Sequence, residues 1–84
     1  MKTVYLDTET TGLDADDEIV EIAIIDDNKN VLVNTLVRPI NQSEWPGAEN
    51  IHGISPTDVK NAPTQTQISG DIGDAVRDCR VVIY

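Results

Sequence analysis

The order of apolar and polar residues predicts three strands in the first half of the chain. Residues 3–9 form a β-branched and aromatic run that ends in acidic residues, which is typical of a strand. Residues 19–26 are almost continuously apolar, as in a strand buried on both faces. A polar turn precedes a third apolar run at residues 31–38. Because the turns are short, we expect an antiparallel meander with the first strand near the middle.

The middle of the chain predicts a short helix and the beginning of another. A loop after residue 39 leads into a short helix expected at residues 48–51. Further on, the sequence at residues 55–58 is Ser-Pro-Thr-Asp. It places a capping Ser before Pro at the first helical position and an acid three residues after the cap. This pattern predicts that a helix begins there.

A longer helix and a final strand follow. Apolar residues recur at helical spacing over residues 66–78, which predicts a helix although Gly70 and Gly73 each cost about 1 kcal/mol. Residues 80–84 then predict a buried strand, parallel to the first because a helical crossover precedes it. Since no polar segment follows this strand, we expect a fragment, with residues 1–84 as one domain.

The composition indicates a cellular compartment, but its net charge is unusual for a protein that binds nucleic acid. The 84 residues include a single Cys, which excludes an internal disulfide framework and fits a reducing compartment. No signal peptide or membrane span is visible, so we expect a cytoplasmic protein. The net charge of −9, with six basic residues against fifteen acidic ones, is unusual for a protein that binds nucleic acid. The acids are either solvated surface residues or ligands of cations that meet phosphate.

Two acids at the end of the first strand are candidate metal ligands. Asp7 and Glu9 are two residues apart on a strand, so their side chains point to the same face. Two converging carboxylates make a hard, oxygen-rich site suited to Mg²⁺ or Mn²⁺. Sheets with helical crossovers tend to bind ligands at the end of a central strand. The pair therefore predicts a divalent-metal site.

Two other motifs compete for the same stretch. The acids of residues 7–18 fit the spacing of an EF-hand calcium loop, but the flanking segments predict strands where an EF-hand needs helices. We therefore exclude a calcium loop. An aspartate-nucleophile phosphatase, with D-x-D-x-T after an apolar strand, stays open although the second acid here is Glu9.

Several segments taken together resemble one enzyme family. The sequences LDTETTGL at residues 6–13, EIVEIAIID at 18–26, IHGIS at 51–55 and VVIY at 81–84 resemble the DEDD superfamily of 3′–5′ exonucleases. That group includes bacterial proofreading subunits, ribonuclease T and exonuclease X-like enzymes. The match runs through nearly the whole chain but spans only about the first half of such a domain.

The resemblance implies a fold and an activity. The fold is a ribonuclease H-like α/β mixed sheet, with three antiparallel strands, then helices and a parallel strand, here truncated. The activity is metal-dependent removal of nucleoside 5′-monophosphates from single-stranded 3′ ends. The resemblance leaves open whether the substrate is DNA or RNA, and whether the role is proofreading, repair or RNA turnover. A non-catalytic nucleotide- or nucleic-acid-binding module is the alternative.

The resemblance also implies roles for individual residues. Asp7 and Glu9 correspond to catalytic carboxylates that hold two Mg²⁺ or Mn²⁺ ions in a two-metal scheme. The positions that correspond to the substrate pocket are Thr10, Thr11, Gly12, Leu13, Ile51 and His52. The family's third and fourth acids and its general-base His lie beyond Tyr84. We therefore expect this chain to be inactive by itself.

The remaining conspicuous residues are expected to be structural. Asp16, Asp17 and Glu18 are interpreted as solvated turn acids, and Trp45 as an anchor that packs its loop on the sheet. Cys79 is interpreted as a small buried hydrophobe. The unpaired edge of the last strand is expected to let the fragment associate with itself.

Overall fold

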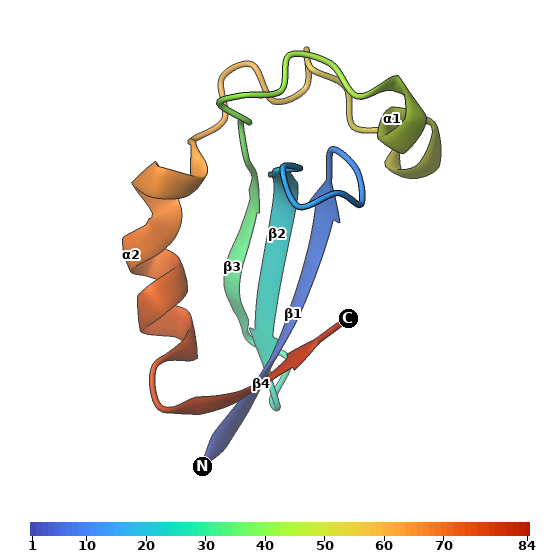
Figure 1. The fold of residues 1–84 in the computed structure, drawn as a ribbon. Helices are drawn as coiled ribbons and strands as arrows, with labels where there is room; N and C mark the ends of the chain where they lie inside the picture. The colour runs from blue at the N-terminus through green and yellow to red at the C-terminus, as the bar shows by residue number, and fades with distance from the viewer.

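The computed structural model describes residues 1–84 as a four-stranded mixed sheet with a helix along one face (Figure 1). The first three strands are β1 (Lys2–Thr10), β2 (Ile19–Asp26) and β3 (Val31–Leu36), paired in antiparallel fashion. The fourth, β4 (Cys79–Ile83), pairs with β1 in parallel, giving the order β3-β2-β1-β4. The predicted meander, the parallel fourth strand and the interior position of β1 are thus confirmed.

Two helices lie between β3 and β4. Helix α1 spans Pro46–His52, and helix α2 spans Gln65–Val76. Both were expected from the sequence, with boundaries that differ by one to two residues. Thr64 caps α2 through a reciprocal pair of hydrogen bonds with Gln67. Neither helix is long and apolar enough to cross a membrane.

The predicted helix start at Ser55 is wrong. The capping hydrogen bonds do form: Ser55 N–H donates to Asp58 Oδ2 at 2.9 Å, and Asp58 N–H donates to Ser55 Oγ at 3.1 Å. Only turns with i to i+3 hydrogen bonds follow, over residues 56–61. Pro63 disfavours a helical residue before it, so a helix from this cap would have about one and a half turns, too few to be stable.

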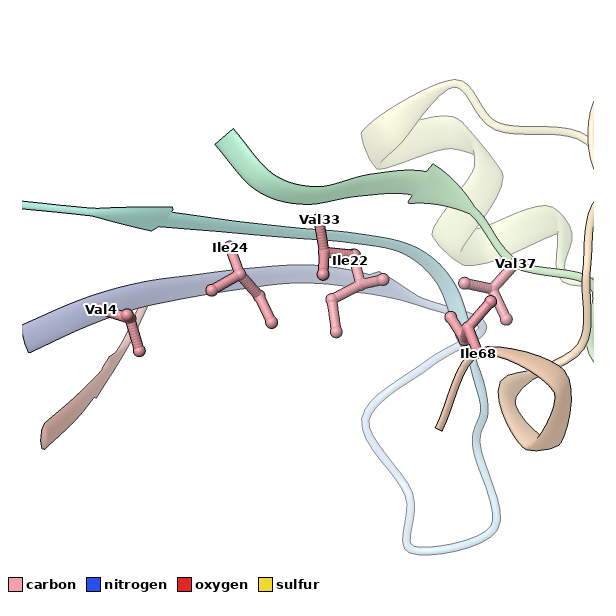
Figure 2. Packing of buried hydrophobic residues seen from close by; sticks show 6 residues of the cluster. All are labelled: Val4, Ile22, Ile24, Val33, Val37 and Ile68. Atoms are coloured by element: carbon pink, nitrogen blue, oxygen red, sulfur yellow. The ribbon is translucent and has the colours of Figure 1, made fainter. Parts of the chain in front are cut away.

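The main core lies between the sheet and α2. Side chains from one face of the three antiparallel strands and from α2 pack in a row along the sheet (Figure 2). Its buried members are Val4, Ile22, Ile24, Val33, Val37 and Ile68. Cys79 packs against this core as a small hydrophobe, but it is half-buried rather than buried as expected. All members are aliphatic, which fits a chain without Phe.

A second, smaller core fixes the loops around α1. Trp45 is buried against Val20 and Val59, and its indole N–H donates to the Ile54 carbonyl at 2.8 Å. The interpretation of Trp45 as a loop anchor is therefore confirmed. Through this contact the segment before α1 and the segment after it are held together above the end of the sheet (Figure 1).

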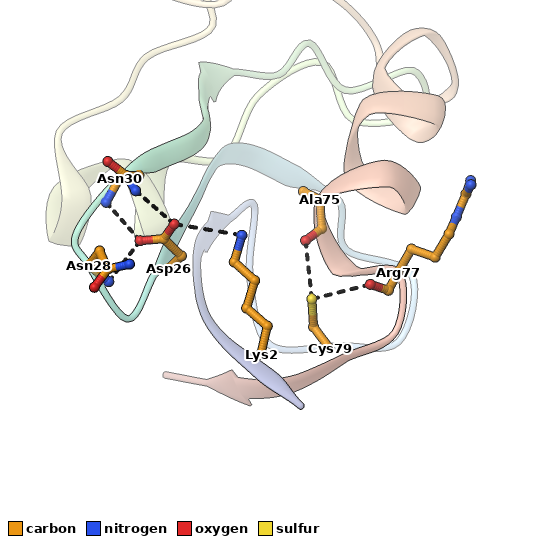
Figure 3. A network of polar contacts seen from close by, with 7 residues as sticks. All are labelled: Lys2, Asp26, Asn28, Asn30, Ala75, Arg77 and Cys79. Carbon is orange, nitrogen blue, oxygen red and sulfur yellow. Dashed lines mark hydrogen bonds and ion pairs between the residues drawn. The ribbon is translucent and has the colours of Figure 1, made fainter.

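The β2–β3 turn is organised by one buried carboxylate. Asp26 accepts hydrogen bonds from the Asn30 side chain and from the backbone N–H groups of Asn30 and Asn28, at 2.8–3.0 Å (Figure 3). Lys2 adds an ion pair at 3.7 Å. The bonds from Asn30, together with the weaker effects of Asn28 and Lys2, hold the pKa of Asp26 below its ordinary value. This acid therefore closes the turn in its charged form.

We predict that Asp26→Asn lowers the urea midpoint of unfolding at pH 7. Because the folded-state pKa is depressed, the contribution of Asp26 is complete above its ordinary pKa of 3.8 and is lost as pH falls through the lower folded value. The difference between wild type and variant should therefore shrink at pH 3. Asp71→Asn, at an exposed acid with no side-chain hydrogen bond, is the matched control. An equally large difference at both pH values would contradict the prediction.

Candidate metal and nucleotide site

Strand β1 separates the core from the candidate metal ligands. Val4 and Leu6 pack in the core beneath α2, so the alternating side chains of Asp7 and Glu9 project from the opposite face. Asp7 is exposed and Glu9 is half-buried. Neither carboxylate makes a hydrogen bond or an ion pair within residues 1–84. Both are therefore unengaged oxygen donors on the sheet face that α2 leaves uncovered.

A third carboxylate lies on this face. Glu21 of β2 pairs directly opposite Glu9 of β1, so two like charges face each other across the strands. Asp7, in contrast, lies opposite the small Ala23. The structure contains no group of three or more acidic, imidazole or thiolate side chains placed to hold one ion. Glu21 thus adds negative potential beside the pair, a placement that only the strand register reveals.

The hard carboxylate oxygens of Asp7 and Glu9 fit Mg²⁺ or Mn²⁺ by type. They are also unpaired, so a cation would not have to displace an existing partner. Two carboxylates satisfy only part of an octahedral shell, and water would have to occupy the remaining positions. The residues present therefore fit a divalent ion held loosely.

A pocket of about 270 Å³ includes one of these carboxylates, that of Glu9, in its lining. One wall comes from the end of β1 and the following loop, and the other comes from α1. Its lining residues are Glu9, Thr10, Gly12, Leu13, Ala48, Ile51 and His52. Leu13 and Ile51 are almost fully exposed, so the pocket has apolar edges that are open to solvent. Two segments about 40 residues apart in the sequence thus meet at one cavity.

Most of the predicted substrate residues meet there, but not all. Thr10, Gly12, Leu13, Ile51 and His52 line the pocket. Thr11 does not line it, and neither does Asp7. Ala48 also lines it, although it was not among the predicted substrate residues. The signal for Ala48 is its position three residues before Ile51 on one helix, which places both on the same face.

Thr11 is occupied within its own loop. Its buried hydroxyl donates to Asp17 Oδ1 at 2.6 Å and accepts from Glu18 N–H at 2.9 Å. Asp17 Oδ2 also accepts from Asp14 N–H at 2.8 Å. A Cβ at Gly12 would lie 2.5 Å from this carboxylate, so the close packing of the loop requires glycine there. The loop that forms one pocket wall is therefore built around Asp17.

Glu18 joins this loop to a distant one. Its carboxylate accepts three backbone N–H groups at 2.8–2.9 Å, those of Ile40, Asn41 and Gln42. The interpretation of Asp17 and Glu18 as solvated turn acids is therefore wrong, whereas Asp16 is exposed and makes no hydrogen bond. Loop N–H groups without strand partners require acceptors, and these two acids provide them.

His52 connects α1 to the end of β1. Its Nδ1 accepts from Ile54 N–H at 3.0 Å, so Nε2 carries the proton and donates to the Thr10 carbonyl at 2.9 Å. The ring can reach both partners because α1 ends at once: Gly53 adopts a left-handed conformation with φ of 78°. With both nitrogens engaged, His52 lines the pocket and joins its two walls.

Comparison with known proteins identifies the family. Residues 4–84 match the family of exonucleases named RNase T. The chain is 42% identical over 81 residues to a protein of Escherichia phage 186 named as an uncharacterized exonuclease, CP81. That match covers 96% of this chain and 41% of the phage protein, so the chain spans less than half of that relative.

A structural comparison shows the fold. The fold is similar to that of exonuclease I in a crystal structure with the inhibitor BCBP, with a TM-score of 0.77 and 23% identity. The similarity covers 98% of this chain and 20% of that one, and it shows the expected ribonuclease H-like fold. Because the family match extends over nearly all 84 residues, the chain belongs to the RNase T family of exonucleases, within the DEDD superfamily.

Proposed function

We propose that this chain is the N-terminal part of the catalytic domain of a divalent-metal-dependent 3′–5′ exonuclease. Its substrate would be a single-stranded 3′ end, from which it releases nucleoside 5′-monophosphates. The observation that carries the proposal is the pocket of about 270 Å³, which includes the unengaged carboxylate of Glu9 in its lining, with Asp7 two residues earlier on the same face of β1. A terminal nucleotide in this pocket would have its phosphate near Glu9.

The pocket walls suit a nucleotide by their chemistry. The apolar side chains of Leu13 and Ile51 offer surfaces on which a base can pack. Gly12 contributes only backbone to the wall, because the space that a side chain would occupy there is filled by the Asp17 carboxylate. His52 uses both ring nitrogens for structure, so its part is to position the walls.

Asp7 and Glu9 would hold Mg²⁺ or Mn²⁺ at the phosphate. The ions, when bound, would supply positive charge for the phosphodiester and lower the pKa of coordinated water. The two carboxylates place the ligand oxygens on one sheet face, and Glu21 raises the local attraction for cations. Because the chain has a net charge of −9 and these carboxylates are negative, a phosphate could approach them only with a bound cation between.

A non-catalytic nucleotide-binding module is the second candidate. It requires only the pocket and no metal ligands beyond Asp7 and Glu9. An aspartate-nucleophile phosphatase finds no support, since the family is one of exonucleases. The two remaining candidates share the pocket and differ in whether catalysis occurs there.

The outer edge of β4 has no strand partner, and the face carrying Asp7 is not covered by a helix. We propose that copies of this chain associate through that edge, opposed by the charge of −9, so that added salt promotes association. Light scattering at rising salt tests this. A monomer at high concentration and high salt would contradict it.

We predict that Mn²⁺ binds weakly at Asp7 and Glu9. Paramagnetic broadening of the amides of residues 7–13 should appear in wild type at lower Mn²⁺ than in Asp7→Ala, because the variant loses one of two carboxylate ligands. Asp16→Ala makes the same change of charge at an exposed acid outside the pocket and should behave as wild type. Equal broadening in wild type and Asp7→Ala would rule out this metal site.

We predict that the two hydrogen bonds of His52 have separable effects. His52→Gln can keep the donor to Thr10, whereas His52→Asn can keep the acceptor for Ile54; each loses one bond, worth about 0.5–1.5 kcal/mol. Both should be destabilised by similar amounts. Only His52→Asn should lose several-fold affinity for thymidine 5′-monophosphate in NMR titrations, because the Thr10 contact lies at the pocket. Equal affinities in the two variants would show that His52 contributes stability alone.

We predict that the 84-residue chain has no detectable exonuclease activity. With two carboxylates, an ion keeps most of its water and its position is not fixed, and misplacement can cost about 100-fold. Lack of a general base typically costs a further 100- to 10,000-fold, and both nitrogens of His52 are already engaged. The assay is release of nucleoside monophosphate from a labelled oligonucleotide with Mn²⁺. Robust release by wild type that Asp7→Ala abolishes would overturn the prediction.

A further inference from the structure

Basic side chains are few in this chain, and their placement is uneven. Of the six Lys and Arg residues, two are in ion pairs: Lys2 with Asp26 and Arg77 with Asp74. Arg38 and Lys60 make no ion pair and no side-chain hydrogen bond, although they are 22 residues apart in the sequence. Both nevertheless line the same pocket.

This pocket of about 310 Å³ has no acidic residue in its lining. The other three pockets of the molecule each include at least one Asp or Glu. Besides the two cations, the polar side chains in the lining are neutral: Gln42, Ser43 and Thr57. In a chain with fifteen acids, an acid-free pocket that carries two cations is the place where an anion meets the least repulsion.

The backbone of the site is fixed by contacts on both sides. Arg38 N–H donates to the Pro63 carbonyl at 2.8 Å, which joins the segment after β3 to the segment before α2. Lys60 N–H closes a turn on the Thr57 carbonyl at 3.3 Å. Trp45 and Val59 line the pocket with buried side chains that pack on each other. Figure 1 shows the two segments running side by side above the sheet.

Two acids, Asp58 and Glu44, are adjacent in sequence to residues that line this pocket, and neither belongs to the lining. Glu44 is exposed and makes no hydrogen bond or ion pair, whereas Asp58 is engaged elsewhere. Asp58 lies between Thr57 and Val59, but its Oδ2 accepts from Ser55 N–H at 2.9 Å. The backbone hydrogen bond from Ser55, followed by that from the Ser55 hydroxyl, holds the pKa of Asp58 below its ordinary value. Glu18 accepts the N–H groups of Ile40 to Gln42 rather than pairing with Arg38. Glu18 shares a neighbouring pocket with Arg38, but none of these acids forms an ion pair with Arg38 or Lys60.

We propose that Arg38 and Lys60 form a phosphate-binding site for the backbone of a single-stranded nucleic acid. The choice of nucleic acid as the ligand rests on the proposed function; the preference for a phosphate rests on the pocket itself. The Arg38 guanidinium can engage two phosphate oxygens at once, and Lys60 adds a mobile point charge. Helix α1 follows Trp45, its N-cap residue, which lines this site, and ends at His52, which lines the nucleotide pocket. A strand whose last nucleotide occupies that pocket would have an upstream phosphate at Arg38 and Lys60.

The test measures binding of a labelled twelve-nucleotide oligo-dT to the 84-residue chain by fluorescence anisotropy, in EDTA and at several salt concentrations. EDTA removes metal ions, so the result does not depend on Asp7 and Glu9. The variant is Arg38→Gln with Lys60→Gln. Its matched control is Lys29→Gln with Arg80→Gln, which makes the same change of net charge at two other unpaired cations. NMR spectra of both double variants confirm that the fold is intact.

We expect the Arg38 and Lys60 variant to lose about tenfold in affinity at low salt and the control to lose less than twofold. The slope of log affinity against log salt should fall by about 1.4 in the first variant, from two phosphate contacts on a single strand. Inorganic phosphate should shift the amides of residues 57–60. Equal losses in the two double variants would overturn the proposal, even if inorganic phosphate alone shifts those amides. The oligo-dT measurement in EDTA does not depend on the outcome of the Mn²⁺ experiment with Asp7→Ala. The phosphate site and the metal site can therefore be refuted independently.

Discussion

The alternation of side chains along β1 is the constraint on which the remaining structure depends. Val4 and Leu6 must pack beneath α2, and the period of two then fixes Asp7 and Glu9 on the opposite face. A register shift of one residue would bury both carboxylates and expose the core residues, which the hydrophobic effect strongly opposes. The same packing that stabilises the sheet therefore specifies where the candidate metal ligands lie.

The acids of this chain serve a structural purpose that its composition does not reveal. Asp17, Glu18, Asp26 and Asp58 each accept one or more backbone N–H groups in loops and turns. Such groups have no partner in a strand or helix, and a charged acceptor satisfies them strongly. The acids behind the net charge of −9 thus belong to three groups: acceptors of hydrogen bonds in loops, solvated acids, and the carboxylates on the exposed face of β1. The net charge does not by itself argue against a nucleic-acid substrate.

The sequence predicted the strands, their pairing and the longer helix well, because periodicity is a local signal that the core then enforces. It was wrong at Ser55, where the capping pattern was present but Pro63 left too little length for a helix. The interpretation of Asp17 and Glu18 as solvated acids was also wrong. Both accept hydrogen bonds from backbone N–H groups that come close to them only when the loops have folded. Most of the nucleotide pocket followed from family resemblance. The place of Ala48 in the pocket could be seen only from the face of helix α1 on which it lies. The position of Glu21 opposite Glu9 could be seen only from the register of β1 and β2.

The pocket depends on the core through a short chain of contacts. His52 holds α1 against Thr10, while the indole of Trp45 binds the Ile54 carbonyl and Ile54 N–H binds His52. Trp45 is itself buried against Val20 of β2. A change in the packing of this small core would therefore move α1 relative to the end of β1, and with it the wall that carries Ile51. The geometry at Glu9 is set by residues that touch neither a metal nor a nucleotide, so a rigid scaffold is part of the site.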